Sequence, residues 1–452
     1  MRLWRVQVAL TALIGLAGTA ALAQRGAQAA DWRQWRGPAN TGMAPGDAPL
    51  RWDDATNVEW KVEIPGRGFS TPIIVGNRLF VTTAIPAGDA GAAQPAAGGR
   101  RGPGGGAGAG IEHRFVLMAL DRETGKTLWE RTATVATPHE GYHRIYGSFA
   151  SNSPVSDGTR VYAFFGSRGL YAYDLEGKEA WRKDFGVQMR MRLQFGEGSA
   201  VVYESGRLLV LYDHQGDSFL AALDAATGRE LWRTPRIARS NWSTPFVAEH
   251  AGRRQVVVTA SEAVRAYDFE SGKEIWSAAG LGENTIPQPM QQGDLVIVMS
   301  GYRNPNLLAI RLGRTGDLTG TDAIVWSTQR GLSYTPSPLL HDNKLYLVTD
   351  SAQVSCFNAT TGAPYYQQAR LDKPYNFKAS PVGASGRMYL ATEEGNVVVV
   401  RMGEKFEVLA TNALTDQSFI ASPVIAGGDI FLRSRTHLFR ISEDAGALAS
   451  AR

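Results

Sequence analysis

The sequence predicts an all-β fold, an eight-bladed β-propeller of four-stranded blades, from three observations. A turn phrase ending in Trp recurs along the chain, a Ser/Thr-Pro marker precedes its copies, and one last strand stands at the opposite end of the chain from its blade. Repeats of about 40 to 50 residues are typical of propeller blades, each of which is one four-stranded sheet. The 50 glycines and 11 tryptophans also favour a turn-rich β protein.

The first thirty residues have the pattern of a secretory signal peptide. Arg2 and Arg5 precede an uncharged run from Val6 to Ala23, and small-residue cleavage sites follow. We therefore predict a signal peptide over 1–30 and a single mature domain over 31–452. The alternative is an uncleaved membrane anchor, because the run is about long enough to span a bilayer. Without a Cys near the cleavage sites to carry a lipid, we expect a periplasmic or secreted protein with no anchor after cleavage.

The turn phrase explains how one blade is built. It reads "ALDRETGKTLW" at 119–129 and "ALDAATGRELW" at 222–232, with altered copies at 172–181, 266–276 and 356–366. Its Asp and Gly are expected to close a tight turn between two strands, Asp through side-chain to backbone bonds and Gly through a positive φ. The Trp that follows is expected to cover the seam between neighbouring sheets.

Counting strands indicates that the repeats close into a ring. Eight apolar runs that act as first strands begin at 70, 152, 198, 243, 287, 336, 379 and 421. Seven last strands follow, marked by Trp129, Trp181, Trp232, Trp276, Trp326, Tyr366 and Phe406. The eighth is "NVEWKVEIP" at 57–65, which carries Trp60 but has no first strand before it. We therefore expect the N-terminal strand to complete the C-terminal blade, as in a closed propeller.

One segment interrupts the first blade. Residues 86–112 are dominated by Gly, Ala and Pro, a composition that cannot bury enough apolar surface to order a chain. We predict a disordered insert there.

Composition and charge exclude several classes of partner. With 44% hydrophobic and 20% charged residues, the chain can bury a large core. Its net charge of +4, which falls to +2 without Arg2 and Arg5, is too weak to argue for nucleic acid or an anionic membrane. The single Cys356 has no intramolecular disulfide partner and is expected to be a buried strand residue. We expect a monomer.

Binding residues are expected on one face of the ring. The loop entering each first strand and the loop between the second and third strands emerge together around the central channel, where a cleft with converging polar groups would form. These loops carry the candidate ligand-binding residues Arg67, Asn152, Asp213, His214, Asp217, Asn241, Trp242, Glu283, Asn284, Tyr302, Arg303, Tyr334 and Lys378. Trp242 is suited to stack a planar ligand, and equally to blade packing.

Two clusters are candidates for metal binding or proton transfer. Asp213, His214 and Asp217 place two carboxylates and an imidazole within five residues; the competing interpretation is a turn in which both aspartates bind backbone amides. His139 and His143 have the spacing of a helical metal pair. Pro138 and Gly141 favour a crossover loop for that stretch instead. The metal, if there is one, stays unassigned.

The repeated phrase and several other stretches of the sequence resemble those of a known protein family. The turn phrase resembles the Trp-docking repeat of pyrroloquinoline quinone (PQQ) dehydrogenases, which also occurs in the propeller lipoprotein of the outer-membrane β-barrel assembly machinery. "WRQWRGP" at 32–38, "GRGFSTPIIVGNRLFVTTA" at 66–84, "QGDSFLAALD" at 215–224 and "PSPLL" at 336–340 look like a group of exported bacterial PQQ-like propellers. The likeness is specific for fold and weak for activity.

The resemblance to PQQ dehydrogenases implies a disulfide between adjacent cysteines, a calcium ion held by carboxylate and Asn, and an Asp base. One cysteine excludes the disulfide. Glu283 with Asn284, or Asp213 with Asp217, supply oxygen donors that calcium accepts, but none stands in a matching motif. A haem-attachment CxxCH is also missing from the sequence. We therefore assign no cofactor and keep PQQ and Ca²⁺ as alternatives.

Three hypotheses of function follow. The first is an exported, non-catalytic scaffold that presents its channel face to a protein, peptide or glycan of the cell envelope. The second is a quinoprotein-like oxidoreductase or another propeller enzyme, with Asp213 as base, His214 beside it, and Arg303 or Lys378 holding an anionic group. The third is an outer-membrane protein assembly factor.

Overall fold

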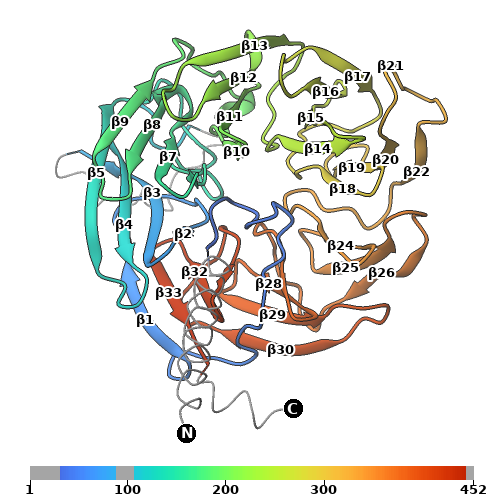
Figure 1. Ribbon diagram of the computed structural model, residues 1–452. Helices are drawn as coiled ribbons and strands as arrows, with labels where there is room; N and C mark the ends of the chain where they lie inside the picture. The colour runs from blue at the N-terminus through green and yellow to red at the C-terminus, as the bar shows by residue number, and fades with distance from the viewer. Residues whose placement is uncertain (1–30, 88–105, 444–452) are drawn as a thin grey trace, which may run out of the picture.

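Eight antiparallel sheets form a ring around a central axis in the computed structural model, which describes residues 31–87 and 106–443 (Figure 1). The first four blades contain, in order, β2 (Ile73–Val75), β3 (Arg78–Pro86), β4 (His113–Asp121) and β5 (Thr127–Ala136); β6 (Val155–Ser156), β7 (Arg160–Phe164), β8 (Leu170–Asp174) and β9 (Glu179–Lys183); β10 (Val202–Glu204), β11 (Arg207–Tyr212), β12 (Ser218–Asp224) and β13 (Glu230–Arg236); β14 (Phe246–His250), β15 (Arg253–Val258), β16 (Val264–Asp268) and β17 (Glu274–Ala278).

The remaining blades complete the circle. They contain β18 (Met290–Gln292), β19 (Leu295–Ser300), β20 (Asn306–Arg311) and β22 (Ile324–Thr328); β23 (Leu339–His341), β24 (Lys344–Val348), β25 (Gln353–Asn358) and β26 (Pro364–Arg370); β27 (Val382–Ala384), β28 (Arg387–Ala391), β29 (Asn396–Arg401) and β30 (Val408–Ala413); β31 (Val424–Ala426), β32 (Asp429–Arg433), β33 (His437–Ile441) and β1 (Val58–Glu63). Within the described residues, two short 3₁₀ helices, η2 (Gly166–Arg168) and η3 (Arg192–Gln194), lie in connecting loops. The predicted eight-bladed all-β fold is confirmed.

The ring is closed by the N-terminal strand. β1 pairs antiparallel with β33, with Lys61 opposite Phe439 and Val62 opposite Leu438. Trp60 on β1 donates its indole N–H to the carbonyl oxygen of Arg122 in the first blade, at 3.0 Å. The strand that the sequence placed out of order thus joins the eighth blade to the first.

The repeated phrase docks several of the blades on their neighbours. Asp121 Oδ1 accepts hydrogen bonds from Thr124 N and Oγ1, both at 2.8 Å, and Gly125 has a φ of 70°. The Trp60 ring lies against this glycine, so close that a Cβ at position 125 would be 2.9 Å from it. Four further Trp/Gly pairs repeat this contact between successive blades: Trp129 with Gly177, Trp181 with Gly228, Trp232 with Gly272, and Trp326 with Gly362. The expected role of the Trp is therefore observed.

Two details depart from the regular pattern. The strand that carries Trp276, β17, pairs in parallel with a short fifth strand, β21 (Gly316–Asp317), which places Trp276 opposite Gly316. The sequence did not reveal this strand because it lies in an extended hairpin of the following blade. Phe406 was placed in a last strand, but β30 begins only at Val408, and Phe406 packs beside Tyr366 at 5.8 Å between ring centroids.

The Ser/Thr-Pro markers form hydrogen bonds around the axis. The N–H of Ser337 donates to Ser380 Oγ at 2.9 Å, that of Ser380 to Ser422 Oγ at 3.1 Å, and that of Ser422 to Thr71 Oγ1 at 3.2 Å. Thr71 N–H continues the series to Ser153 Oγ at 2.9 Å. Each link joins two blades, so the marker fixes the inner ends of the first strands that surround the channel.

The segment before β1 also crosses the central region of the ring, in blue in Figure 1. Trp32 pairs with Ile74, and Trp35 donates its indole N–H to Ser422 Oγ at 3.3 Å. Arg36 is fully buried and donates to the carbonyl oxygens of Pro338 and Pro381, both at 2.8 Å. The "WRQWRGP" stretch therefore ties four blades together.

Two predictions concern residues outside the described ranges. The predicted signal peptide, 1–30, lies wholly outside them, and the predicted disordered insert, 86–112, lies outside them over residues 88–105. At the edges of the insert, Pro86 ends β3 and Ala107 forms a bridge with Tyr142. Within the described ranges, no helix is long and apolar enough to cross a membrane.

Candidate functional site

A cavity of about 520 Å³ lies on the propeller axis. All eight loops that enter the first strands contribute to its wall, together with Trp35 and the loop between β19 and β20. The cavity therefore occupies the place where the sequence predicted that polar loops would converge. Its size is typical of a pocket for a small organic molecule.

Seven of the thirteen predicted binding residues line this cavity. They are Asn152, Trp242, Asn284, Tyr302, Arg303, Tyr334 and Lys378. The other six lie outside its wall: Arg67, Asp213, His214, Asp217, Asn241 and Glu283. Sequence reasoning missed several wall residues, among them Tyr146, Arg192, Phe195 and Glu197.

One side of the wall is an aromatic platform. The rings of Tyr302 and Tyr334 are stacked, with centroids 5.1 Å apart and planes 28° from parallel. Arg303 lies over Tyr302 at 5.4 Å, and Asn284 Nδ2 approaches the Tyr334 hydroxyl at 3.5 Å. Burial raises the pKa of Tyr334, so its hydroxyl is protonated and able to donate at neutral pH. The loop between β19 and β20 and the loop between β22 and β23 thus together supply a flat face to the cavity.

Trp242 adds a second aromatic surface. Its indole N–H donates to the carbonyl oxygen of Gly196 at 2.8 Å, and its backbone N–H donates to the carbonyl oxygen of Thr285 at 3.1 Å. Both contacts join neighbouring blades. Trp242 therefore combines the two roles that the sequence left open, because it packs between blades and also faces the cavity.

Lys378 is held by a carboxylate behind the wall. Its ammonium group lies 2.7 Å from Asp350 Oδ2, 3.7 Å from Glu393 Oε1, and 4.8 Å from the centre of the Tyr146 ring. Burial lowers the pKa of Lys378, but Asp350 and Glu393 outweigh it and raise the pKa overall. The same Asp350 accepts the backbone N–H of Tyr334 at 3.1 Å. Asp350 thus positions two wall residues at once.

Two arginines of the wall share one carboxylate. Glu283 Oε2 lies 2.6 Å from Arg192 Nη1 and 3.8 Å from Arg303 Nη1. The hydrogen bond from Arg192 lowers the pKa of Glu283. Glu283, predicted to bind a ligand or calcium, is instead the partner of two guanidinium groups.

The loop 143–147 is fixed from behind by Arg67. This side chain donates to the carbonyl oxygens of Arg144, Ile145 and Gly147 at 2.9 to 3.1 Å, and Arg435 donates to Ile145 O at 2.7 Å. Arg67 therefore supports the loop that carries Tyr146 rather than facing the cavity itself.

The predicted centre around Asp213 is a buried ion pair. Arg236 donates to both Asp213 oxygens, at 2.8 and 2.9 Å, and neither side chain is exposed to solvent. Asn241 Nδ2 donates to the same carboxylate at 3.0 Å. Because its oxygens are occupied, Asp213 has a structural environment that does not suit a catalytic base or a calcium ligand. The sequence could not show this, since Arg236 lies on another strand.

The neighbours of Asp213 do not form a metal site either. His214 is buried; burial lowers its pKa, and its Nδ1 accepts the N–H of Arg190 at 3.2 Å. Asp217 is exposed at the turn. Both polar ends of the Asn241 side chain are hydrogen-bonded within the protein. Its NH₂ group donates to Asp213 and to Thr259 O, and its amide oxygen accepts from Thr285 Oγ1. The predicted site around Asp213 is instead a hydrogen-bonded network that holds together β11, β13 and the loop that enters the fourth blade.

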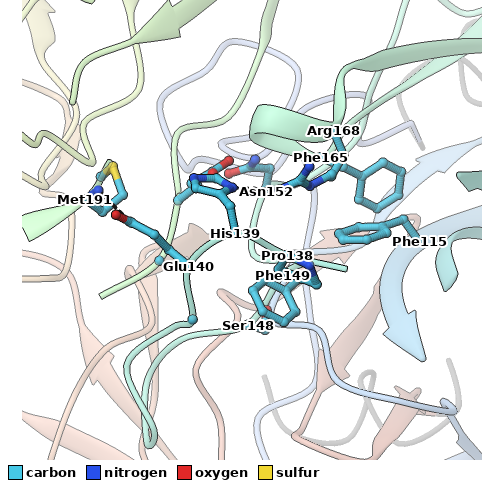
Figure 2. A pocket seen from close by; sticks show the side chains of 13 residues that line it. Phe115, Pro138, His139, Glu140, Ser148, Phe149, Asn152, Phe165, Arg168 and Met191 are labelled. Carbon is cyan, nitrogen blue, oxygen red and sulfur yellow. Dashed lines mark hydrogen bonds between the residues drawn. The ribbon is translucent and has the colours of Figure 1, made fainter. Parts of the chain in front are cut away.

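A second, smaller cavity of about 30 Å³ adjoins the first and contains His139 (Figure 2). His139 Nε2 lies 2.7 Å from Met189 O, and Nδ1 lies 2.7 Å from Arg168 Nη2. A carbonyl only accepts and a guanidinium only donates, so in this arrangement Nε2 acts as the donor and Nδ1 as the acceptor. His143 lines the axial cavity instead. The two histidines therefore do not form the metal pair considered from their spacing.

Glu197 belongs to the walls of both cavities. Its carboxyl accepts the N–H of Ser167 at 2.6 Å and pairs with the Ser167 hydroxyl at 2.5 Å. Burial raises the pKa of Glu197, although the bonds from Ser167 act in the opposite direction. The residue links the second and third blades beside the axis.

Comparison with known proteins decides the family. The family model described as outer membrane protein assembly factor BamB matches residues 113–363 and 216–449. The chain belongs to this family. The BamB-type propeller is also 24% identical over 328 residues to BamB of Burkholderia pseudomallei, covering 68% of this chain and 80% of that protein.

Dehydrogenases are relatives too. A polyvinylalcohol dehydrogenase of a Pseudomonas species is 25% identical over 280 residues, but the match covers 52% of this chain and 37% of the enzyme. The quinohemoprotein alcohol dehydrogenase from Comamonas testosteroni has a TM-score of 0.61 with 11% identity, over 93% of this chain and 82% of that one. The latter likeness shows the fold alone.

The residues of the BamB-type cavity do not fit a calcium-bound quinone. In the described part of the chain, Glu197 is the one carboxylate in the axial wall, and it is bound to Ser167. The alternative oxygen donors, Glu283 and Asp213, hold arginines. Among the described residues, no group of three or more His, Cys, Asp or Glu side chains converges as metal ligands would. Cys356 is fully buried on β25.

Proposed function

We propose that this BamB-type propeller is a non-catalytic binding protein of the cell envelope that holds its ligand in the axial cavity. One observation carries the proposal: the charged side chains of the wall are engaged within the protein. Lys378 is paired with Asp350, Arg192 and Arg303 with Glu283, and Glu197 is bonded to Ser167. A general base or nucleophile has to be free to exchange a proton or attack. A wall whose cations and carboxylate are engaged in this way suits recognition.

Outer-membrane protein assembly is the setting that the family match favours. The BamB of Burkholderia pseudomallei is matched over most of its length, and the predicted signal peptide would deliver this chain to the same side of the inner membrane. In that setting the channel face would receive a protein, peptide or glycan of the envelope, and the propeller would act as a monomer.

A quinoprotein function is the second candidate, favoured by the match to polyvinylalcohol dehydrogenase. It requires that PQQ and Ca²⁺ together support oxidation of an alcohol. The oxygen donors described above are engaged with arginine and serine, which argues against this candidate.

Two measurements test the proposal. The protein is incubated with separate pools of small molecules, peptides and glycans from a bacterial envelope. Native mass spectrometry then measures the mass of any bound component, first in the complex and again after its release. We expect a retained component that is released chemically unchanged and is lost in the double variant W242A/Y334A. The variant L128A, at an exposed position of β5, is the matched control.

The second measurement adds PQQ and Ca²⁺ and follows reduction of an electron-accepting dye with alcohols. We expect no alcohol-dependent reduction. Turnover that disappears in E197Q, or release of a chemically altered component in the first assay, would contradict a non-catalytic role.

A further inference from the structure

We propose that the axial cavity recognises an uncharged ring bearing several hydroxyl groups, that is, a neutral saccharide. This inference rests on the proposed binding function and names the chemistry of its ligand. It combines three features of the wall: flat aromatic faces, cations that are paired with carboxylates, and hydrogen-bonding groups that stay accessible.

The aromatic faces suit a sugar ring. The stacked pair Tyr302 and Tyr334 and the indole of Trp242 enter the wall from different loops. One face of a pyranose presents C–H groups that pack on an aromatic ring, while the hydroxyl groups point outward around its edge. An amphipathic aromatic side chain with a polar tip, such as Tyr334, can contact both parts. These residues are held by bonds to Asp350 and Gly196, so the platform is organised before a ligand arrives.

The charges of the wall argue for an uncharged ligand. Its three cations, Arg192, Arg303 and Lys378, face Glu283, Asp350 and Glu393. Among the described residues, each of these cations therefore has at least one carboxylate partner within 4 Å. A ligand with several carboxylates, such as PQQ, would bring further negative charge beside Glu283 and Asp350, and placing like charges next to each other is unfavourable in a partly buried site. A neutral ligand leaves every pair in place.

The paired groups keep hydrogen-bonding capacity at their edges. Arg303 is 61% exposed, and a guanidinium has five N–H donors. Glu283 lies 3.8 Å away, so most of these donors face solvent. Asn284 is held with a φ of 54° and reaches Tyr334 through its NH₂ group, leaving its amide oxygen as an acceptor. Planar donors and acceptors beside an aromatic face are the arrangement that binds pairs of neighbouring hydroxyls.

The test measures the preference among ligand classes by intrinsic tryptophan fluorescence and by calorimetry. The probes are neutral disaccharides (maltose, cellobiose and diacetylchitobiose), glucuronic acid as the anionic sugar, PQQ as the planar anion, and a short acidic peptide. We expect saturable binding of at least one neutral disaccharide, with affinity reduced tenfold or more in Y334A and in W242A. The variant Y334F keeps the ring and loses the hydroxyl, so it should weaken binding by about tenfold or less. L128A should bind as the unaltered protein does.

The outcomes separate this inference from the proposed function. Tighter binding of glucuronic acid, PQQ or the peptide than of every neutral disaccharide would overturn the saccharide assignment and leave a non-catalytic binding protein. A failure of all three neutral disaccharides to bind would overturn it as well. Binding of a sugar followed by its oxidation would instead overturn the proposed function, because the ligand would then be a substrate. Equal affinity in Y334A and L128A would place the sugar outside the axial cavity.

Discussion

Asp350 holds Lys378 at 2.7 Å while accepting the backbone N–H of Tyr334, so a single carboxylate behind the wall positions a cation and an aromatic ring of the axial cavity. The two side chains of the pair are mostly buried, with 22% and 13% of their surfaces exposed. Removing the charge of Asp350 would therefore disturb stability and the site together.

We expect D350N to lower the free energy of unfolding by about 1 to 3 kcal/mol, because it weakens hydrogen bonds to a charged, partly buried group. Urea unfolding measures the change. The control is D342N: Asp342 pairs with Lys344 but is 78% exposed, and an exposed pair contributes about 0 to 1 kcal/mol. Equal losses in both variants would show that Asp350 has no special role.

The buried pair of Asp213 and Arg236 makes a stronger prediction. D213N leaves the guanidinium buried without its counter-ion, which costs about 3 to 5 kcal/mol. Replacing both partners, as in D213N/R236M, should recover part of this loss. D217N, at the exposed turn, is the matched control and should change stability by less than about 0.5 kcal/mol. A D213N protein as stable as the unaltered one would return Asp213 to the list of functional candidates.

The docking of Trp181 on Gly228 can be tested with alanine. Gly228 has a φ of 71°, and a Cβ there would be 2.6 Å from the Trp181 ring. G228A should cost about 2 to 4 kcal/mol, from backbone strain and displacement of the ring. Gly206 has a similar φ of 80° with open space around it, so G206A should show only the strain of about 1 to 2 kcal/mol. Thermal unfolding that ranks G206A below G228A would refute the docking argument.

Glu197 makes stability depend on pH. Burial raises the pKa of this carboxyl above its ordinary value of 4.5, so the folded protein binds the proton more tightly than the unfolded chain. The stability that this group contributes is therefore complete below about pH 4.5 and is lost as pH rises through the raised pKa. Histidines whose pKa values are lowered from the ordinary value of 6.5, such as His214, act with the opposite slope.

The test compares E197Q with the unaltered protein by urea unfolding from pH 4 to 8. Because the histidines are common to both, the difference in unfolding free energy isolates Glu197. We expect the unaltered protein to lose stability relative to E197Q as pH rises. A difference that stays constant with pH would contradict the raised pKa.

The architecture could be predicted from the sequence because it depends on contacts between short repeated stretches. The site could be predicted only in part. Trp60, the turn glycines and the Ser/Thr-Pro markers each act through contacts that recur in several blades, so their pattern is visible in the sequence. The loops between them identified the cavity face and seven of its residues. Tyr146, Arg192 and Glu197 carried no repeating signal, since each enters the wall from an irregular loop.

The order of residues along the chain by itself determined the number of blades, the turn and Trp contacts that join them, and the closure by the N-terminal strand, because these depend on short repeated stretches. Only the tertiary structure decided which charges meet. Arg236 reaches Asp213 from another strand, and Asp350 reaches Lys378 from another blade, so the energy of burying each group depends on a partner that sequence spacing does not reveal. That pairing removed Asp213 from the candidate site and balanced the charges of the axial cavity.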